Sequence, residues 1–340
     1  MRILLATDAW RPQVNGVVRT LENMTQAGMA QGASFDFVTP DAFPTFPLPT
    51  YAEIPLAIPN RREIARRIDA SGADHVHIVT EGPIGWAARN YCLERGQMFT
   101  TGYHTRFPEY LRARTMIPED WTYGLLRRFH APSAAVMAPT PSIRDELVRR
   151  GFAAVRVWTR GVDHALFRPR PGNAFGLPRP IFLYVGRIAV EKNLEALLSL
   201  DLPGSTVLVG DGPARGRLAR RYRRAHFLGH RFGEALAQAY ASADVFVFPS
   251  RTDTFGIVLL EALASGLPVA AFPAPGPLDV IGDSGAGVLS EDLAQGCLAA
   301  LDISRDTARA RALEFSWAES ARQFLGHIAE RRAAPLSRTA

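Results

Sequence analysis

Apolar residues follow two patterns along this chain: short continuous runs, and longer stretches in which they recur every three or four positions. The runs predict buried β-strands, and the longer stretches predict amphipathic helices. In the first half, strands are expected at 3–6, 35–39, 75–79, 99–103, 135–138 and 155–158. Helices are expected between them, at 18–31, 61–70, 85–95, 121–130 and 142–150.

The pattern breaks at 168–180, where proline and glycine dominate, and we interpret this stretch as a linker. The alternation then resumes, with strands expected at 181–185, 206–209, 226–228, 245–248, 269–272 and 287–289. Helices are expected at 194–198, 215–224, 234–242, 256–265 and 292–301. A last helix is predicted over 317–331, because apolar side chains there share one face: Ala321, Phe324, Leu325 and Ile328.

This alternation predicts an α/β fold with two doubly wound parallel sheets. We expect an N-terminal domain over 1–167, a linker over 168–180 and a C-terminal domain over 181–310. A C-terminal helix within 311–334 is expected to pack back on the N-terminal domain. Two such domains are expected to face one another across a cleft, which is a favoured place for small ligands.

The composition is that of a soluble globular protein, with 340 residues of which 47% are hydrophobic and 21% charged. Cys92 and Cys297 lie far apart, which favours a reducing cytoplasm over a disulfide framework or a metal site. Met1 leads directly into the first apolar strand, and no run of 18 apolar residues occurs. We therefore expect a cytoplasmic protein with no signal peptide and no membrane-spanning helix.

The net charge is +6, and Lys192 is the only lysine among 39 basic residues. A single retained lysine suggests that a compact point charge is needed at that position. Arginine runs at 61–67 and 215–224 raise the alternative of a nucleic-acid-binding module. Because charge runs on helices are usually solvated faces, we favour that interpretation and expect no nucleic-acid partner.

Candidate chemistry is concentrated in 248–270. Asp253 lies in the loop after a strand, where open α/β sheets place their ligands. Glu261 falls among leucine and alanine on the next helix, where a carboxylate needs a hydroxyl or amide partner. The amides of Phe255, Gly256 and Ile257 precede or begin this helix and suit hydroxyl or phosphate oxygens. The alternatives are that Asp253 caps the helix and that Glu261 is a solvated helix residue.

Two further loops follow the first strands of the second half. Gly186 and Arg187 directly follow one strand, and Lys192 lies five residues beyond Arg187. A guanidinium fork and an ammonium point charge together suit a diphosphate, and the alternative is a surface salt bridge between Lys192 and Glu191. The glycine turn at Gly210 suits a base or ribose placed against the backbone.

The first half offers two weaker candidates, each after an apolar strand. Gly16 lies in a loop before a helix, where the backbone can approach an anion. That loop lacks the glycine spacing of a dinucleotide site. His104 follows the strand at 99–103, and a lone histidine there is either structural or catalytic.

As a set, these motifs resemble the GT-B-fold retaining glycosyltransferases of family 4, and the resemblance covers nearly the whole chain. Asp253 and Glu261 have the spacing of the family's E-x7-E motif. The supporting matches are 186–193, 210–213 and the loop through Gly16. The segments 103–110 and 158–169 are most similar to the branch with GDP-mannose-dependent α-mannosyltransferases and sulfoquinovosyl-diacylglycerol synthases.

The resemblance implies a hexosyltransferase that moves a hexose, with mannose favoured, from a nucleotide-sugar donor to a lipid or glycan acceptor with retention. The donor would be a GDP- or UDP-hexose. The resemblance assigns the donor diphosphate to Arg187 and Lys192, and the ribose hydroxyls to Glu261. It assigns hydroxyls of the transferred sugar to Asp253, and contact with the donor sugar to His104. Donor-binding backbone is implied at Gly16, Gly186, Gly210, Phe255, Gly256 and Ile257.

Two departures from the family pattern affect the choice of hexose. Asp253 stands where glutamate is usual, and the loop after Phe272 is rich in proline instead of glycine. Because Arg187 and Lys192 supply positive charge at the leaving diphosphate, we expect no metal and no cofactor. A sugar-nucleotide epimerase of the same shape is the rival enzyme.

The segment 106–130 mixes five arginines with apolar side chains, which are Phe107, Tyr110, Leu111, Met116, Ile117, Trp121 and Tyr123. Such a mixture suits the headgroup boundary of an anionic membrane. We therefore expect a peripheral enzyme that glycosylates a lipid at the cytoplasmic face of the inner membrane. The alternative is that these apolar residues pack in the core of the first domain.

Overall fold

The computed structural model describes residues 1–13, 15–48, 51–112 and 115–333. Three predicted features extend beyond the described residues. They are the loop before Gly16 at Val14, the segment 106–130 at Arg114, and the C-terminal helix at Ala334.

Internal contacts divide the chain into two domains. The first comprises Met1–Thr159 together with the C-terminal segment from Trp317, and the second comprises Arg160–Ser316. Residues 160–180 contain neither strand nor helix, yet they belong to the second domain. The Ala174 amide donates to Ser242 Oγ at 3.0 Å, for example. The chain therefore passes between the domains twice.

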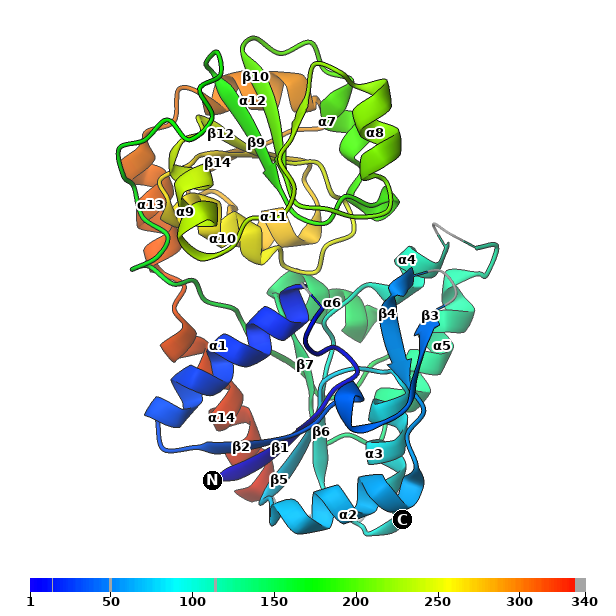
Figure 1. The fold of residues 1–340 in the computed structure, drawn as a ribbon. Helices are drawn as coiled ribbons and strands as arrows, with labels where there is room; N and C mark the ends of the chain where they lie inside the picture. Colours follow the sequence, from blue (N-terminus) through cyan, green and yellow to red (C-terminus); the bar gives the residue numbers. More distant parts are fainter. Residues whose placement is uncertain (14, 49–50, 113–114, 334–340) are drawn as a thin grey trace. The chain divides into compact units, whose positions relative to one another are not determined.

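The first domain is built on a six-stranded parallel sheet in the order β2-β1-β5-β6-β7-β8 (Figure 1). Its strands are β1 (Arg2–Ala6), β2 (Ser34–Val38), β5 (His75–Ile78), β6 (Phe99–Gly102), β7 (Val136–Ala138) and β8 (Val155–Val157). The intervening helices are α1 (Gly16–Ala30), α2 (Arg61–Ser71), α3 (Pro83–Glu94), α5 (Glu119–His130) and α6 (Pro141–Arg149). The predicted elements are confirmed here to within about two residues.

A hairpin and a short helix of the first domain were not predicted. β3 (Thr45–Leu48) and β4 (Tyr51–Ala57) form an antiparallel hairpin, and α4 (Phe107–Arg112) is a short helix. Prolines in 44–55 obscure the apolar alternation, and proline is tolerated in a hairpin outside the main sheet.

Both faces of the first sheet are buried, as parallel sheets require. In β1, Leu4 and Ala6 contribute to one core, while Ile3 and Leu5 contribute to the other. The C-terminal helix α14 (Trp317–Ala333) packs against α1 and places Phe324 and Ile328 in the second core. The C-terminal segment thereby completes the hydrophobic core of the N-terminal domain.

The second domain repeats the plan with the sheet order β11-β10-β9-β12-β13-β14 (Figure 1). Its strands are β9 (Ile181–Val185), β10 (Ser205–Val209), β11 (His226–Phe227), β12 (Val245–Phe248), β13 (Val269–Ala271) and β14 (Gly287–Leu289). The predicted helices are α7 (Leu194–Leu198), α8 (Arg215–Arg221), α9 (Gly233–Ala241), α10 (Ile257–Ala264) and α12 (Leu293–Ala300). α8 ends three residues earlier than predicted, because the backbone of Tyr222 leaves the helical region.

Two helices of the second domain were not predicted, α11 (Pro275–Val280) and α13 (Arg305–Leu313). The proline-rich loop after Phe272 therefore turns directly into a helix, with Pro275 in its first turn. α13 is rich in arginine and alanine and buries only Ala308 and Ala312, which leaves a weak hydrophobic pattern.

Strand order reverses once in each sheet, between β1 and β5 in the first and between β9 and β12 in the second. Ligands of open α/β sheets bind beside the carboxyl ends of the strands at such a reversal. In the second domain, the loop after β9 carries Lys192 and the loop after β12 carries Asp253. The topology therefore places these two side chains at the ligand-binding edge.

Candidate active site

A lysine–aspartate pair lies at the centre of the reversal in the second sheet. Lys192 Nζ donates to Asp253 Oδ1 at 2.5 Å, and each side chain is 16% exposed. The second carboxylate oxygen of Asp253, Oδ2, is buried and has no hydrogen-bond partner within the described residues. A buried acceptor without a donor is unfavourable in the protein alone, so this atom is suited to receive a hydroxyl from a ligand.

Two contacts between loops hold this pair in place. Asn193 Nδ2 donates to the Pro249 carbonyl at 3.1 Å, and Thr252 Oγ1 donates to the Glu191 carbonyl at 3.2 Å. Asn193 itself adopts a left-handed backbone with φ 53°, a conformation that asparagine tolerates better than most residues. The loops after β9 and β12 are therefore joined on both sides of the Lys192–Asp253 contact.

The neighbouring loops approach one another through glycine. A Cβ atom on Gly210, whose φ is 135°, would lie 1.9 Å from the carbonyl oxygen of Gly186. On the other side, a Cβ atom on Gly276 would lie 2.6 Å from the carbonyl oxygen of Phe255. Glycine at these positions keeps the strand edge lined with backbone, as a closely bound phosphate or ribose requires.

Glu261 is buried on α10, with 1% of its surface exposed. Tyr240 donates from its hydroxyl to Glu261 Oε2 at 2.9 Å. The expectation that this carboxylate has a hydroxyl partner is therefore confirmed, and the alternative of a solvated helix residue is wrong. Glu261 lies little more than one turn into α10, because that helix begins at Ile257.

The alternative that Asp253 caps α10 is also wrong. The residue at the cap position is Gly256, with a left-handed φ of 84° and no side-chain capping bond. Phe255 is buried beside it, while Ile257 is half-buried at the first helical position. Arg187 is half-buried after β9, and the Tyr184 hydroxyl donates to its carbonyl at 2.9 Å.

The remaining two predicted residues lie in the first domain. Gly16 begins α1, and the side chain of Asn15 caps that helix by accepting from the amides of Val17 and Val18 at 3.0 Å. His104 follows β6 and packs edge-on against Trp158, with ring centroids 5.6 Å apart. A Cβ atom on Gly102 would lie 2.5 Å from His104 Nε2, so a larger residue at this position would force the ring to move.

Sequence reasoning missed Asp8, which follows β1 at the reversal of the first sheet. Its carboxylate accepts from the Ile84 amide at 2.8 Å, the Gly85 amide at 3.3 Å and the Thr80 hydroxyl at 2.9 Å. Burial raises the pKa of Asp8 to about 6, and these three hydrogen bonds oppose the shift. In the sequence, the position of Asp8 directly after an apolar strand could have indicated this site.

A second missed group joins side chains from the loop after β5, from β6 and from the end of α5. Glu81 Oε1 lies 3.2 Å from His130 Nε2, and His130 Nδ1 lies 2.8 Å from Thr101 Oγ1. His130 ends α5, so no local pattern connects it with the loop after β5. The Glu81 carboxylate is therefore partly exposed and is held in place by the buried His130 side chain.

No helix among the described residues combines the length and the apolar character needed to cross a bilayer. No group of three or more His, Cys, Asp or Glu side chains gathers there in a way that suits a metal ion.

The arrangement of the two domains' elements is shared with solved glycosyltransferase structures. The sucrose-phosphate synthase of Thermosynechococcus elongatus aligns with 98% of this chain and 99% of its own, with a TM-score of 0.75 and 20% sequence identity. Together with the glycine-lined strand edge, this similarity places the chain in the GT-B class of glycosyltransferase folds.

Sequence comparisons specify the family. Residues 14–166 match the family described as Glycosyltransferase Family 4, and residues 179–303 match Glycosyl transferases group 1. The chain is 31% identical over 316 residues to a GDP-mannose-dependent alpha-mannosyltransferase of Mycobacterium tuberculosis, covering 85% of this chain and 83% of the relative. It is 34% identical over 256 residues to the sulfoquinovosyl transferase SQD2 of Arabidopsis thaliana, covering 70% and 50%. The chain belongs to glycosyltransferase family 4 and is a hexosyltransferase.

Proposed function

We propose that this protein transfers a hexose, with mannose favoured, from a nucleotide-sugar donor to its acceptor with retention at the anomeric carbon. The observation that carries the proposal is the Lys192–Asp253 pair at the reversal of the second sheet, with Asp253 Oδ2 buried and without a donor. The mycobacterial relative is named for its dependence on GDP-mannose, which favours that donor here.

In this proposal Lys192 and Arg187 bind the donor diphosphate. Negative charge develops on the leaving diphosphate during transfer, and fixed cations there lower the barrier without a metal ion or cofactor. Asp253 Oδ2 accepts a hydroxyl of the transferred hexose, and Glu261 binds the ribose. The roles of Gly16 toward the phosphates and of His104 toward the donor sugar remain predictions that rest on the family resemblance.

The donor is tested with a thermal-shift panel of GDP, UDP and ADP on the wild type and on Lys192→Ala. A ligand at 100 times its dissociation constant stabilises by about 2.7 kcal/mol. We expect GDP to raise the melting temperature most, and Lys192→Ala to lose that rise. An equal response of the variant would remove the diphosphate role from Lys192.

The reaction is tested with radiolabelled GDP-mannose and membrane lipid extract, and the anomeric configuration of the product is read by NMR. Transfer is expected to survive EDTA; abolition by EDTA with rescue by Mg²⁺ or Mn²⁺ would overturn the metal-free proposal. Donor incubated alone separates the rival class, because an epimerase converts it to another sugar nucleotide whereas a transferase at most hydrolyses it slowly.

The acceptor proposal rests on the segment 106–130, which divides its apolar side chains between core and solvent. On α5, Tyr123 and Phe129 are buried, whereas Trp121 is 78% exposed. Just before the helix, Met116 is 99% exposed. Other exposed apolar residues of this segment are Phe107, Ile117 and Leu125. Packing in the core of the first domain therefore explains only some of the apolar side chains of this segment.

The exposed residues support a membrane-facing surface. Exposed apolar side chains that form one patch mark interaction sites, and Trp121 and Leu125 share a face of α5 as an i, i+4 pair. The same segment exposes arginines, which are Arg112, Arg127 and Arg128. Each basic residue near an anionic surface contributes about 1 kcal/mol. We therefore propose a lipid acceptor, reached by peripheral binding at an anionic membrane on the cytoplasmic side.

Co-sedimentation with anionic and neutral vesicles at low and high salt tests this proposal. We expect binding to anionic vesicles only, weakened by salt and by the double variant Met116→Ser with Trp121→Ser. Leu313→Ser is the matched control, since Leu313 is an exposed apolar residue of α13 in the other domain. Absence of vesicle binding, with full activity on a soluble sugar, would assign the acceptor to the aqueous phase.

A further inference from the structure

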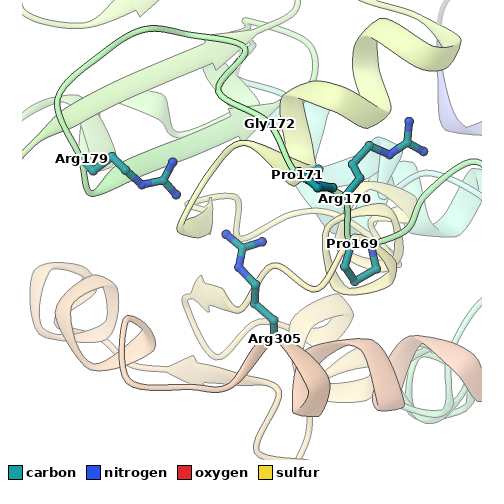
Figure 2. A pocket seen from close by; sticks show the side chains of 7 residues that line it. Pro169, Arg170, Pro171, Gly172, Arg179 and Arg305 are labelled. Carbon is teal, nitrogen blue, oxygen red and sulfur yellow. The ribbon is translucent and has the colours of Figure 1, made fainter.

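An open cavity of about 450 Å³ lies in the second domain, apart from the residues assigned to the donor. It is lined by Pro169, Arg170, Pro171, Gly172, Arg179, Ala241 and Arg305. Figure 2 shows Arg179 and Arg305 extending toward one another from different elements, whereas the Arg170 guanidinium points away from them. The volume falls within the range of small-molecule sites, roughly 300–1,000 Å³.

Positive charge exceeds negative charge around the two facing guanidinium groups. Arg179 forms an ion pair with Asp244, and the other Asp244 oxygen accepts from the Ile181 amide at 2.7 Å. Arg305 donates to the Ala243 carbonyl and forms no ion pair with any described residue. Two guanidinium groups therefore share the field of one carboxylate.

The pKa of Arg305 is consistent with an excess of positive charge around this side chain. Burial lowers the pKa of Arg305, the Asp244 carboxylate opposes the shift, and the Arg179 cation adds to the lowering. Arg309, one turn further along α13, is similarly affected by burial and by the nearby Arg168 cation, which lower its pKa. An anion between Arg179 and Arg305 would relieve this repulsion and accept charge-assisted hydrogen bonds from both guanidinium groups.

The wall of the cavity is held in place by close contacts. A Cβ atom on Gly172 would lie 1.9 Å from Gln238 Nε2 on α9, so this segment runs close against the side chains of that helix. The Ala174 amide donates to Ser242 Oγ at 3.0 Å, immediately beyond α9. Contacts within the second domain therefore fix the position of this wall.

The cavity lies at the sheet edge opposite the donor residues. Arg179 precedes β9 and Asp244 precedes β12, while Lys192 and Asp253 follow the same two strands. A strand advances about 3.3 Å per residue, so the five residues of β9 separate the two edges by roughly 16 Å. A ligand in this cavity is therefore a second ligand and not the donor diphosphate.

We propose that this cavity binds a phosphate-class anion between the guanidinium groups of Arg179 and Arg305. Guanidinium forks match the geometry of phosphate oxygens and hold them through charge-assisted hydrogen bonds. The open cavity has room for a phosphate carried on a larger molecule, either a soluble phosphate ester or a lipid headgroup. The site is independent of the proposed donor and acceptor.

The test uses inorganic phosphate as the probe, measured by calorimetric titration of the full chain with the donor site filled by saturating nucleoside diphosphate. We expect one phosphate site to remain, weakened at least about tenfold by Arg305→Gln, since a hydrogen bond to a charged group is worth about 1.5–3 kcal/mol. Arg220→Gln is the matched control, because Arg220 is an exposed arginine on α8 with no ion pair among the described residues.

Two results would overturn the proposal, and a second variant and two further ligands complete the test. Phosphate binding that the nucleoside diphosphate abolishes, or that Arg305→Gln leaves unchanged in a folded protein, would overturn the proposal. Arg305→Lys, which keeps the charge without the fork, should retain part of the affinity and guards against misfolding of the first variant. Glycerol 3-phosphate and phosphatidic acid vesicles then distinguish a soluble ester from a lipid headgroup, each scored by loss in Arg305→Gln.

Discussion

Removing the charge of Lys192 is the change that separates the structural and chemical roles of the Lys192–Asp253 pair. Lys192→Met keeps most of the apolar stem and deletes the ammonium group. Asp253 would then lose its 2.5 Å partner at Oδ1 while its Oδ2 is already without one. Asp253→Asn and the double variant complete a cycle in which the uncompensated carboxylate is present only in the first single variant.

The size of the effect follows from the burial of the pair. Breaking a fully buried ion pair by removing one partner costs about 3–5 kcal/mol. Each side chain here is 16% exposed, so residual hydration of Asp253 lowers the expected cost in unfolding free energy to about 1–3 kcal/mol. Transfer activity is expected to fall about 100-fold or more, because a preorganised charge that acts on the developing diphosphate is lost.

Two assays on the wild type, the two single variants and the double variant separate the effect on stability from the effect on activity. Chemical denaturation reports stability, and we expect the double variant to regain part of what Lys192→Met loses, since no carboxylate is left unpaired. Radiolabelled transfer reports activity, which the double variant should not regain because the diphosphate still lacks its cation. Lys192→Arg, with a planar fork in place of a point charge, should be stable and intermediate in activity.

Two results would refute this reasoning. Near-wild-type turnover of a folded Lys192→Met protein would show that the lysine serves only Asp253. Recovery of turnover in the double variant would show that the activity loss came from the unpaired carboxylate and not from the missing cation.

Three further predictions follow from single contacts. Asp8, whose folded pKa of about 6 lies above its ordinary 3.8, stabilises the fold below pH 3.8 and loses that contribution as pH rises through 6. Asp8→Asn should therefore remove about 2 kcal/mol of pH dependence in denaturation from pH 4 to 7, and an unchanged slope would contradict it. Gly210→Ala should fail to yield folded protein by circular dichroism, since its Cβ would lie 1.9 Å from the Gly186 carbonyl; a wild-type melting curve would argue otherwise. Glu261→Gln should keep its fold beside Tyr240 yet lose most nucleotide affinity in the thermal-shift assay, and undiminished affinity would remove the ribose role.

Local patterns in the sequence were sufficient for the secondary structure and the fold class. Apolar runs predicted every strand of both main sheets. The inner strands β1, β9 and β12 contain few polar positions because both of their faces are buried. The same local pattern placed Lys192 and Asp253 at the carboxyl edge, since every loop that follows a parallel strand lies there. The hairpin β3–β4 was missed because its prolines interrupt the alternation.

Strand order was needed to bring particular loops together. Lys192 and Asp253 are 61 positions apart, and they meet because β12 returns to pair with β9. Tyr240 was likewise unforeseen as the partner of Glu261, because α9 and α10 meet only in the folded domain.

Solvent exposure was also decided by the tertiary structure. The apolar pattern of α5 allowed two faces, and packing chose the face of Tyr123 for the core and left that of Trp121 in solvent. Arg179 and Arg305 show the same limit, since no local signal connects a segment before β9 with the start of α13. Propensity and periodicity act between near neighbours in the chain, whereas pairing and burial depend on residues that are distant in sequence and meet only when the chain folds.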